Sequence, residues 1–253
     1  MRFFDDLEAR TAGERQALYA TPQLVAGVAG RIPRAAYLAY LAQAFHHVRQ
    51  TVPLLSLARD RMDAGRHRYR QALTDYIQEE TGHEEWILDD IANAGGDAAA
   101  VRRSAPGEPV AAMVAFVRGY IEHSDPMGMF GMIYVLEGTS TALATHGASA
   151  LSEALGLGPE CFTYLSSHGT LDQQHMAFFA ALMNTVQDPG DQAAIVAVAQ
   201  EVCRLFAAMF SAIPLDDEAP GPAAGAHGGR PVDSIADAAR PGPDVELAGA
   251  RRQ

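Results

Sequence analysis

Hydrophobic residues recur at intervals of three and four along the first long stretch of the chain, which is the period of an α-helix that buries one face. This stretch runs from about Pro33 to about Met62. Proline is well tolerated in the first turn of a helix, so Pro33 suits its start. Pro53 lies inside the stretch and has no N–H group to donate, so it is expected to kink the helix.

The helical period continues along the chain as far as about Ile213. Residues 3–20 mix phenylalanine and leucine with charges, which indicates an amphipathic helix or arm. Residues 97–108 contain proline and glycine and are expected to form a linker. The helices predicted after Met62 span about residues 66–93, 109–123 and 126–156, a segment around His168, and about residues 191–213.

No stretch alternates strictly between apolar and polar residues, so β-strands are not supported. We therefore expect an all-α fold, a bundle of about seven helices with any functional site between facing helices. Residues 1–32 would form an N-terminal helix or arm and residues 33–213 the helical domain. Residues 214–253 hold six of the fourteen prolines and almost no aromatic residues. Such a tail cannot offset its ordering entropy by burial, and it is expected to be disordered.

Composition narrows the functional class. The formal net charge of −12 and the lack of a basic stripe argue against nucleic acid as a partner. The acidic N-terminus is unlike a signal peptide, and no uninterrupted apolar run reaches the ~18 residues of a membrane span. Two cysteines, Cys161 and Cys203, do not form a disulfide framework. We expect a cytoplasmic protein that does not bind a membrane.

The segment around residue 170 holds two histidines and an aspartate at helical spacing. His168, Asp172 and His175 are related as i, i+4 and i+7. On an α-helix these side chains fall within a sector of roughly 60°. Imidazole and carboxylate are both good metal ligands, so this stripe is half of a candidate metal site. A surface pair, or a buried histidine with a hydrogen-bond partner, is the structural alternative.

The predicted helix over residues 66–93 contains a second acid–imidazole pair. Glu80 and His83 are related as i and i+3, and Glu79 and His83 as i and i+4, so either pair shares one helix face. Gly82 lies between them and costs roughly 1 kcal/mol of helix propensity relative to alanine. A glycine inside a helix often permits the close approach of another helix or of a ligand.

Glu137 is a lone acid in an otherwise uncharged stretch from Pro126 to Ser152. A buried carboxylate without a partner costs several kcal/mol or becomes protonated. A core glutamate therefore needs a cation, and a metal ion supplies one. Arg118 is the alternative partner if the fold brings it close.

Together these segments offer three carboxylates and three imidazoles, a set that suits two first-row metal ions. Nitrogen and oxygen ligands without thiolate favour iron or manganese over zinc. Ferritin-like proteins instead carry a Glu-x-x-His pair on each of two helices, and this sequence has only one such pair. The proposed ligands are Glu80, His83, Glu137, His168, Asp172 and His175, with Glu79, His46 and His47 as less certain additions.

Three motifs over about residues 34–210 resemble those of the heme-oxygenase-like diiron oxidases and oxygenases. They are Glu80-x-x-His83-x-x-Trp86, Glu137-Gly138 and His168-x-x-x-Asp172-x-x-His175. This group includes a fatty-acid decarboxylase that forms terminal alkenes and amino-acid N-oxygenases. The resemblance implies the heme-oxygenase-like fold and a diiron site that activates O2. The substrate would be a small molecule, such as an amine, an amino acid or a fatty acid.

One departure from this pattern keeps other functions open. Several members supply an extra glutamate from the first core helix, where this chain has His46 and His47. Either histidine could instead bind haem iron, as in haem oxygenases of the same fold. A metal-free relative similar to the thiaminase-like TenA hydrolases would need a nucleophilic cysteine, and Cys161 is a poor candidate. A non-catalytic helical protein is the remaining alternative. An external electron donor and a homodimer stay open as partners.

Overall fold

The computed structural model describes residues 2–215, with all their side chains except those of Thr145 and residues 168–174. The described chain is all-α, as predicted, with twelve α-helices and three short 3-10 helices. The number is higher than the expected seven because several predicted helices are interrupted. The predicted disordered tail lies outside the described residues from residue 216 onward.

The predicted helix from Pro33 to Met62 is in fact two helices. Helix α4 spans Arg34–Val48 and α5 spans Thr51–Arg61. Pro53 does not kink a continuous helix, because it lies in the first turn of α5, where a missing N–H group breaks no intrahelical hydrogen bond.

The predicted helix over residues 66–93 is also interrupted. Helix α6 spans His67–Glu80, and α7 spans His83–Asn93. Gly82 has φ +94°, a left-handed conformation that glycine adopts without the steric cost other residues bear. The prediction that Gly82 lies inside a helix is therefore wrong: it separates two helices and lets the chain change direction between Glu80 and His83.

The later helices begin and end close to the predicted residues, except in the linker. The predicted linker contains a short helix, α8. A turn at Asp188 caps the last helix: its side chain accepts hydrogen bonds from the N–H groups of Gly190 and Asp191. The bounds are α8 Ala98–Arg103, α9 Glu108–His123, α10 Met129–Leu155, α11 Thr163–Met183 and α12 Pro189–Ser211.

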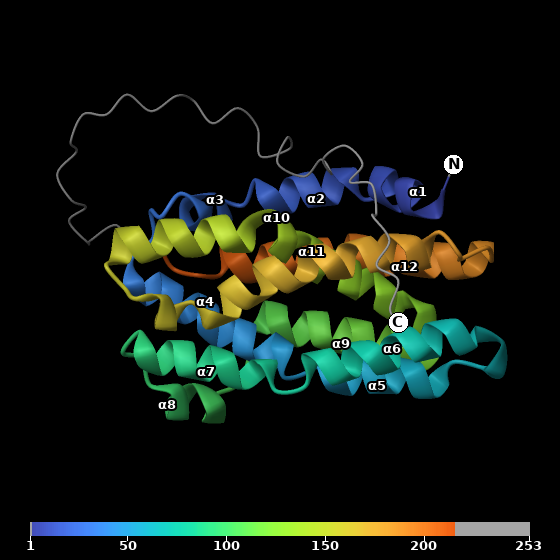
Figure 1. Cartoon of the computed structure of the whole chain (residues 1–253), viewed down its shortest axis with the longest axis horizontal. Helices are drawn as coiled ribbons and strands as arrows, with labels where there is room; N and C mark the ends of the chain where they lie inside the picture. The colour runs from blue at the N-terminus through green and yellow to red at the C-terminus, as the bar shows by residue number, and fades with distance from the viewer. Residues whose placement is uncertain (1, 216–253) are drawn as a thin grey trace, which may run out of the picture. The chain divides into compact units, whose positions relative to one another are not determined.

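Helix α10 lies at the centre of the described bundle and packs against α11 and α12 (Figure 1). Helices α1 Phe3–Arg10, α2 Ala12–Tyr19 and α3 Pro22–Val28 lie along one side of these three, and α4–α9 lie along the other. Gly131 allows α10 to approach α12, because a Cβ atom there would clash with the backbone of Ile195 and Ala199.

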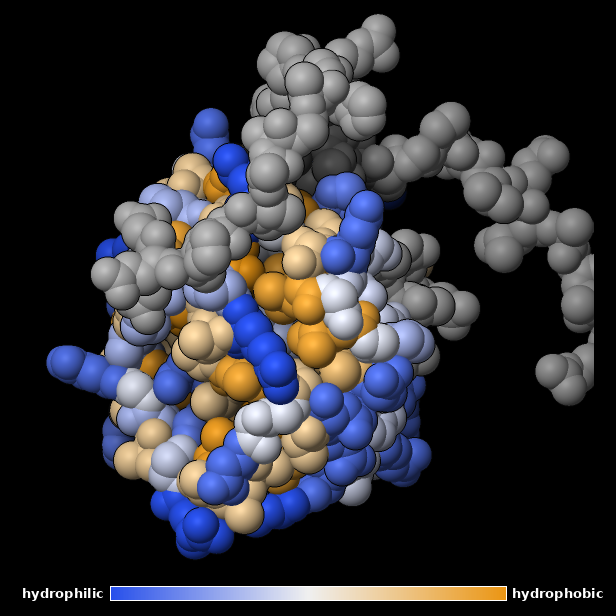
Figure 2. All heavy atoms as spheres, turned by 90° about the vertical axis from the view of Figure 1, so that its left-hand side faces the viewer, coloured by the Kyte–Doolittle hydropathy of each residue, from blue (hydrophilic) through white to orange (hydrophobic). Residues whose placement is uncertain are grey.

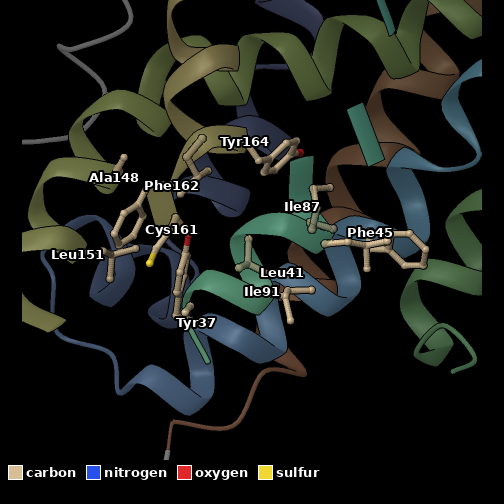
Figure 3. Close-up of a cluster of buried hydrophobic side chains, with 14 of the residues drawn as sticks. Tyr37, Leu41, Phe45, Ile87, Ile91, Ala148, Leu151, Cys161, Phe162 and Tyr164 are labelled. Atoms are coloured by element: carbon tan, nitrogen blue, oxygen red, sulfur yellow. Dashed lines mark hydrogen bonds between the residues drawn. The ribbon is translucent and has the colours of Figure 1, made fainter. Parts of the chain in front are cut away.

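A large cluster of buried side chains joins four segments of the bundle. Tyr37 and Leu41 of α4 contact Ile87 and Ile91 of α7, and residues of α10 and of the segment before α11 complete the cluster (Figure 3). The Tyr37 hydroxyl donates a hydrogen bond of 2.6 Å to the carbonyl oxygen of Cys161. This core fixes α4, α7, α10 and α11, the helices that carry most of the candidate site.

Helix α12 is long and apolar enough to cross a bilayer by length and composition alone. However, 56% of its apolar window is buried inside the protein, as expected for the core helix of a bundle. A charged cluster fixes its start: Arg66 donates to both carboxylate oxygens of Asp125 and to Asp191. Arg66 thereby bridges two acids at this end of the bundle.

Candidate metal centre

Among the acids of the predicted site whose side chains the structure describes, Glu137 of α10 is the most deeply buried. Only 8% of the residue is exposed. The Tyr76 hydroxyl of α6 donates a long hydrogen bond of 3.5 Å to Glu137 Oε2. On its other side, Glu137 Oε1 lies 3.6 Å from Nδ1 of His175, which α11 supplies. Three helices thus meet at this carboxylate.

The surroundings of Glu137 disfavour its negative charge. The pKa of the carboxyl is raised to about 7: burial is the largest cause, His175 opposes it, and the charges of Glu80 and Glu79 add to the rise. The sequence contains no lysine, so among the side chains that always carry a positive charge only an arginine could neutralise Glu137. Arg118, the alternative partner, instead lies 3.9 Å from Glu122 on the same helix. Within the described chain, the positive charge that a buried carboxylate needs is therefore not supplied by an arginine.

His175 links Glu137 to a second acid. Its Nε2 atom lies 3.4 Å from Oε2 of Glu79, whose side chain is half exposed. The ring of His175 also meets the ring of Tyr76 edge-on at a centroid distance of 6.0 Å. Glu79, the less certain candidate, is therefore close to His175, so α6 directs an acid toward α11 from the side nearer to solvent.

Glu80 and His83 form the predicted pair, but across a break between helices. Nδ1 of His83 lies 3.2 Å from Oε2 of Glu80. The left-handed turn at Gly82 makes this possible, because Glu80 ends α6 and His83 begins α7. The ring of Trp86 stacks on that of His83 at 4.1 Å and fixes its orientation. The Glu-x-x-His-x-x-Trp motif thus orders one imidazole beside one carboxylate.

His168 and Asp172 belong to α11, but their side chains lie outside the described part of the chain. Their convergence with His175 therefore stays a prediction. Among the side chains that the structure does describe, no three histidine, cysteine, aspartate or glutamate residues form a closed metal-ligand set. Instead, Glu80 pairs with His83, and His175 lies between Glu79 and Glu137.

The two histidines of α4 have different environments. Nε2 of His46 lies 2.9 Å from the Ser104 hydroxyl, so this ring is held by a hydrogen bond. His47 lies in the wall of two cavities and packs edge-on against Phe206. His47 is therefore the better placed of the two to contact a ligand.

Tyr76 contributes to the site although sequence reasoning did not single it out. It precedes Glu80 by four residues and His83 by seven, so its helical spacing to the acid–imidazole motif was a usable signal. A tyrosine at such a spacing is usually core packing, and only the fold shows that its hydroxyl meets Glu137.

Two cavities adjoin the acids and imidazoles. The smaller one encloses about 520 Å³ of empty space and is lined by Glu80, Glu137 and Tyr76, with Met132 and Leu136 among its apolar walls. The larger one encloses about 860 Å³, part of it open to solvent, between α3, α4, α10, α11 and α12. The candidate site is therefore beside a space that could admit a substrate.

Neither cysteine has the properties of a nucleophile. Burial raises the pKa of the Cys161 thiol above its ordinary value and that of Cys203 to about 12. A reactive cysteine needs the opposite shift, toward the thiolate. Neither residue lines either of the two cavities. The described residues therefore give no support to a metal-free, cysteine-dependent hydrolase.

The donor set fits a metal ion of the first transition row. Glu137 is a buried acid with two further acids and an imidazole near it, and the desolvated charge needs a cation. The neighbouring groups are oxygen and nitrogen donors without thiolate, which suits iron or manganese. The fold and the site together define an all-α protein with an acid–imidazole centre in the heme-oxygenase-like class.

Comparison with known proteins identifies the family. Residues 38–207 match the family described as iron-containing redox enzymes, and the chain belongs to this family. No curated protein matches the sequence significantly. The predicted heme-oxygenase-like fold is thereby confirmed, together with membership of an iron-containing redox family.

Solved structures agree with this fold at low sequence identity. A domain of unknown function with a heme-oxygenase-like fold from Shewanella denitrificans OS217 aligns with a TM-score of 0.75 and 20% identity, over 83% of this chain and 90% of that one. A TenA homologue from Pseudomonas syringae pv. tomato aligns with a TM-score of 0.69 and 12% identity, over 81% and 90%. Heme oxygenase from Leptospira interrogans aligns with a TM-score of 0.67 and 14% identity, over 83% and 99%. These likenesses show the fold alone.

Proposed function

We propose that the protein is a non-haem diiron oxidase or oxygenase that uses O2 to oxidise a small organic molecule. The observation that supports this most is the state of Glu137. It is a buried carboxylate next to His175, Glu79 and Glu80, and no arginine of the described chain neutralises it. One long hydrogen bond from Tyr76 and one imidazole are weak compensation for a buried negative charge, whereas a metal ion would neutralise it directly.

The iron would be held by Glu137 and His175, by Glu80 and His83, and by His168 and Asp172 as the sequence predicts. Iron supplies one-electron redox chemistry toward O2 when it is bound. Glu79 remains the alternative to Glu80, because it is the acid that lies next to His175. A substrate and an external electron donor complete the proposal, and an amine, an amino acid and a fatty acid remain the candidate substrates.

The chain's own residues prepare this site. Tyr76 donates a hydrogen bond to one oxygen of Glu137 and leaves the other facing His175, which orients the carboxylate. Trp86 fixes the plane of the His83 ring. The apolar side chains around the smaller cavity, including Met132 and Leu136, exclude water and so strengthen electrostatic interactions inside it.

The test is anaerobic loading with ferrous iron followed by exposure to O2. We expect about two iron ions per chain, an iron-dependent change in visible absorption after O2 is added, and consumption of O2. Glu137→Gln should lose both the iron and the absorption change. Glu153→Gln, at an exposed position on the same helix, should behave like the original chain. Iron content near zero in the original chain would refute the proposal.

A haem-binding function is the second candidate, because His47 is buried on the first core helix and lines both cavities. In that case haem should bind with a strong Soret band, which His47→Ala should remove and His46→Ala should not. This alternative gives no purpose to the acids around Glu137, so we rank it second.

A further inference from the structure

We propose that the larger cavity holds the hydrocarbon chain of an elongated substrate whose oxidised end lies beside Glu137. This inference rests on the proposed function and specifies its substrate class: a molecule with a straight alkyl or acyl chain. It selects among the candidate substrates, because a free amino acid or a short amine would leave the larger cavity empty.

The two cavities share part of their walls. His47, Leu136, Ser140 and Tyr164 line both of them. Glu80, Glu137 and Tyr76 line only the smaller cavity, whereas the residues of α3 and α12 line only the larger one. A molecule lying along both spaces would therefore have one end at the acids and the other end between α3 and α12.

The wall of the larger cavity suits a hydrocarbon. Among the residues that the structure describes, it contains no aspartate, glutamate or arginine. Apart from His47, its polar members are not ionised at neutral pH, and one of them, Gln23, already uses its amide N–H group on the carbonyl oxygens of Ser211 and Ile213. A charged group placed there would lose its hydration without gaining a counter-charge, whereas an alkyl chain would gain from leaving water.

On the face that Figure 2 shows, apolar side chains gather in the middle, and hydrophilic side chains cross and border them. The segment after α12 contributes Ile213 and Leu215 to the cavity wall, and α3 contributes Leu24 and Val28.

Small residues on one face of α10 keep the cavity open. Ser140, Ala144 and Gly147 follow one another at helical spacing, and all three line it. A Cβ atom at Gly147 would have no other heavy atom within 4 Å, so a side chain there would extend into the empty space rather than into the backbone. These positions should therefore determine how long a chain the site accepts.

Calorimetric titration of the iron-free protein with straight-chain probes tests the inference. The probes are hexanoate, octanoate, decanoate and dodecanoate, with the matching primary alcohols as a second series. Each added methylene should tighten binding about fourfold until the cavity is full, which follows from the transfer free energy of a buried methylene. Tighter binding of the acids than of the alcohols would mean that the protein also recognises a carboxylate, and the rise with chain length is expected in both series.

Two variants connect this binding to the cavity. Gly147→Leu and Ala144→Leu should weaken dodecanoate binding by about tenfold or more while changing hexanoate binding little. Gly119→Leu is the matched control, because Gly119 is also a helical glycine with open space at its Cβ position and lines neither cavity. Thermal unfolding of each variant shows that it is folded. Affinity that does not change with chain length, or Gly147→Leu binding like the original chain, would overturn the inference.

Iron loading of the same preparations separates this inference from the proposed function. Iron binding without chain-length-dependent probe binding would refute the alkyl-chain substrate and leave the iron enzyme standing. Chain-length-dependent probe binding by a protein that takes up no iron on loading would refute the proposed function and, with it, the assignment of the alkyl-chain molecule as a substrate to be oxidised.

Discussion

Asp90 and Glu137 are both buried acids, but their surroundings are opposite in kind. Asp90 is fully buried on α7, and its carboxylate accepts hydrogen bonds of 2.9 Å from the N–H groups of Thr163 and Tyr164. These are the first residues of α11, whose N–H groups have no partner within the helix. Asp90 thus caps the N-terminus of α11, and this structural role accounts for its burial.

Glu137 has no such structural purpose in the described chain. Its close contacts are the hydroxyl of Tyr76 and the ring of His175, and two more acids lie near enough to raise its pKa further. Burial alone therefore does not indicate function, since both acids are buried. The difference is that two backbone N–H groups at 2.9 Å satisfy the carboxylate of Asp90, whereas Glu137 has one long hydrogen bond from Tyr76 and otherwise lies among further potential metal ligands.

Removing the charge of Glu137 should have the largest effect on the metal. Glu137→Gln should lower iron affinity by more than about 100-fold, because losing a residue that merely supports a ligand already costs about 10- to 100-fold. The iron-free variant should remain folded and be at least as stable as the original chain at neutral pH, since a desolvated charge is removed. Equilibrium dialysis and thermal unfolding measure these two effects, with Glu153→Gln as the control.

The stability of the iron-free protein should depend on pH through Glu137. Its pKa rises from an ordinary 4.5 to about 7 in the folded chain, so the folded state binds the proton more tightly than the unfolded state. Stability should therefore fall as pH rises through that window, by up to about 3 kcal/mol from this group. Urea unfolding at a series of pH values measures the slope. An unchanged slope in Glu137→Gln would contradict the buried, proton-binding state of this acid.

Asp90→Asn should lower stability and leave iron binding unchanged, the opposite of the effects expected for Glu137→Gln. An amide offers one acceptor where the carboxylate offers two, so one N–H group at the start of α11 loses its partner, at a cost of about 1–3 kcal/mol. Chemical unfolding should show this loss, while iron content stays near that of the original chain. Asp89→Asn, at an exposed neighbouring position, should change stability by less than about 0.5 kcal/mol. Loss of iron in Asp90→Asn would remove the distinction between the two acids.

The smallest effect is expected at the turn between α6 and α7. Gly82→Ala forces a Cβ atom into a left-handed conformation, which costs about 1–2 kcal/mol, although the space around it is open. It should also weaken iron binding modestly, because Glu80 and His83 face each other across this turn. Gly13→Ala, within α2, should instead stabilise the protein by up to about 1 kcal/mol.

The sequence predicted the helical fold well, because a helix depends mostly on local spacing of apolar residues. It predicted neither the break at residues 49–50 nor the one at Gly82, since the spacing of apolar residues stays helical across a break when both helices bury the same side. Pro53 suggested a kink within one helix, but proline is also well tolerated in the first turn of a new helix, which is where it lies.

For the site, the lone acid at position 137 was informative because burying an unpaired charge is costly in any fold. The contacts of Tyr76 and Glu79 depend on how α6 crosses α10 and α11, and no local spacing encodes that crossing. The pairing of His46 with Ser104 likewise joins segments 58 residues apart. Tertiary packing decides such contacts, so they could not be predicted from periodicity.

The most direct test is an anomalous diffraction map at the iron absorption edge, from crystals grown anaerobically with ferrous iron. The account predicts two iron peaks within coordination distance of the Glu137 carboxylate and the His175 ring, with Glu80 and His83 among the remaining ligands. A map without a peak beside Glu137, or with a single peak in a porphyrin bound to His47, would contradict it.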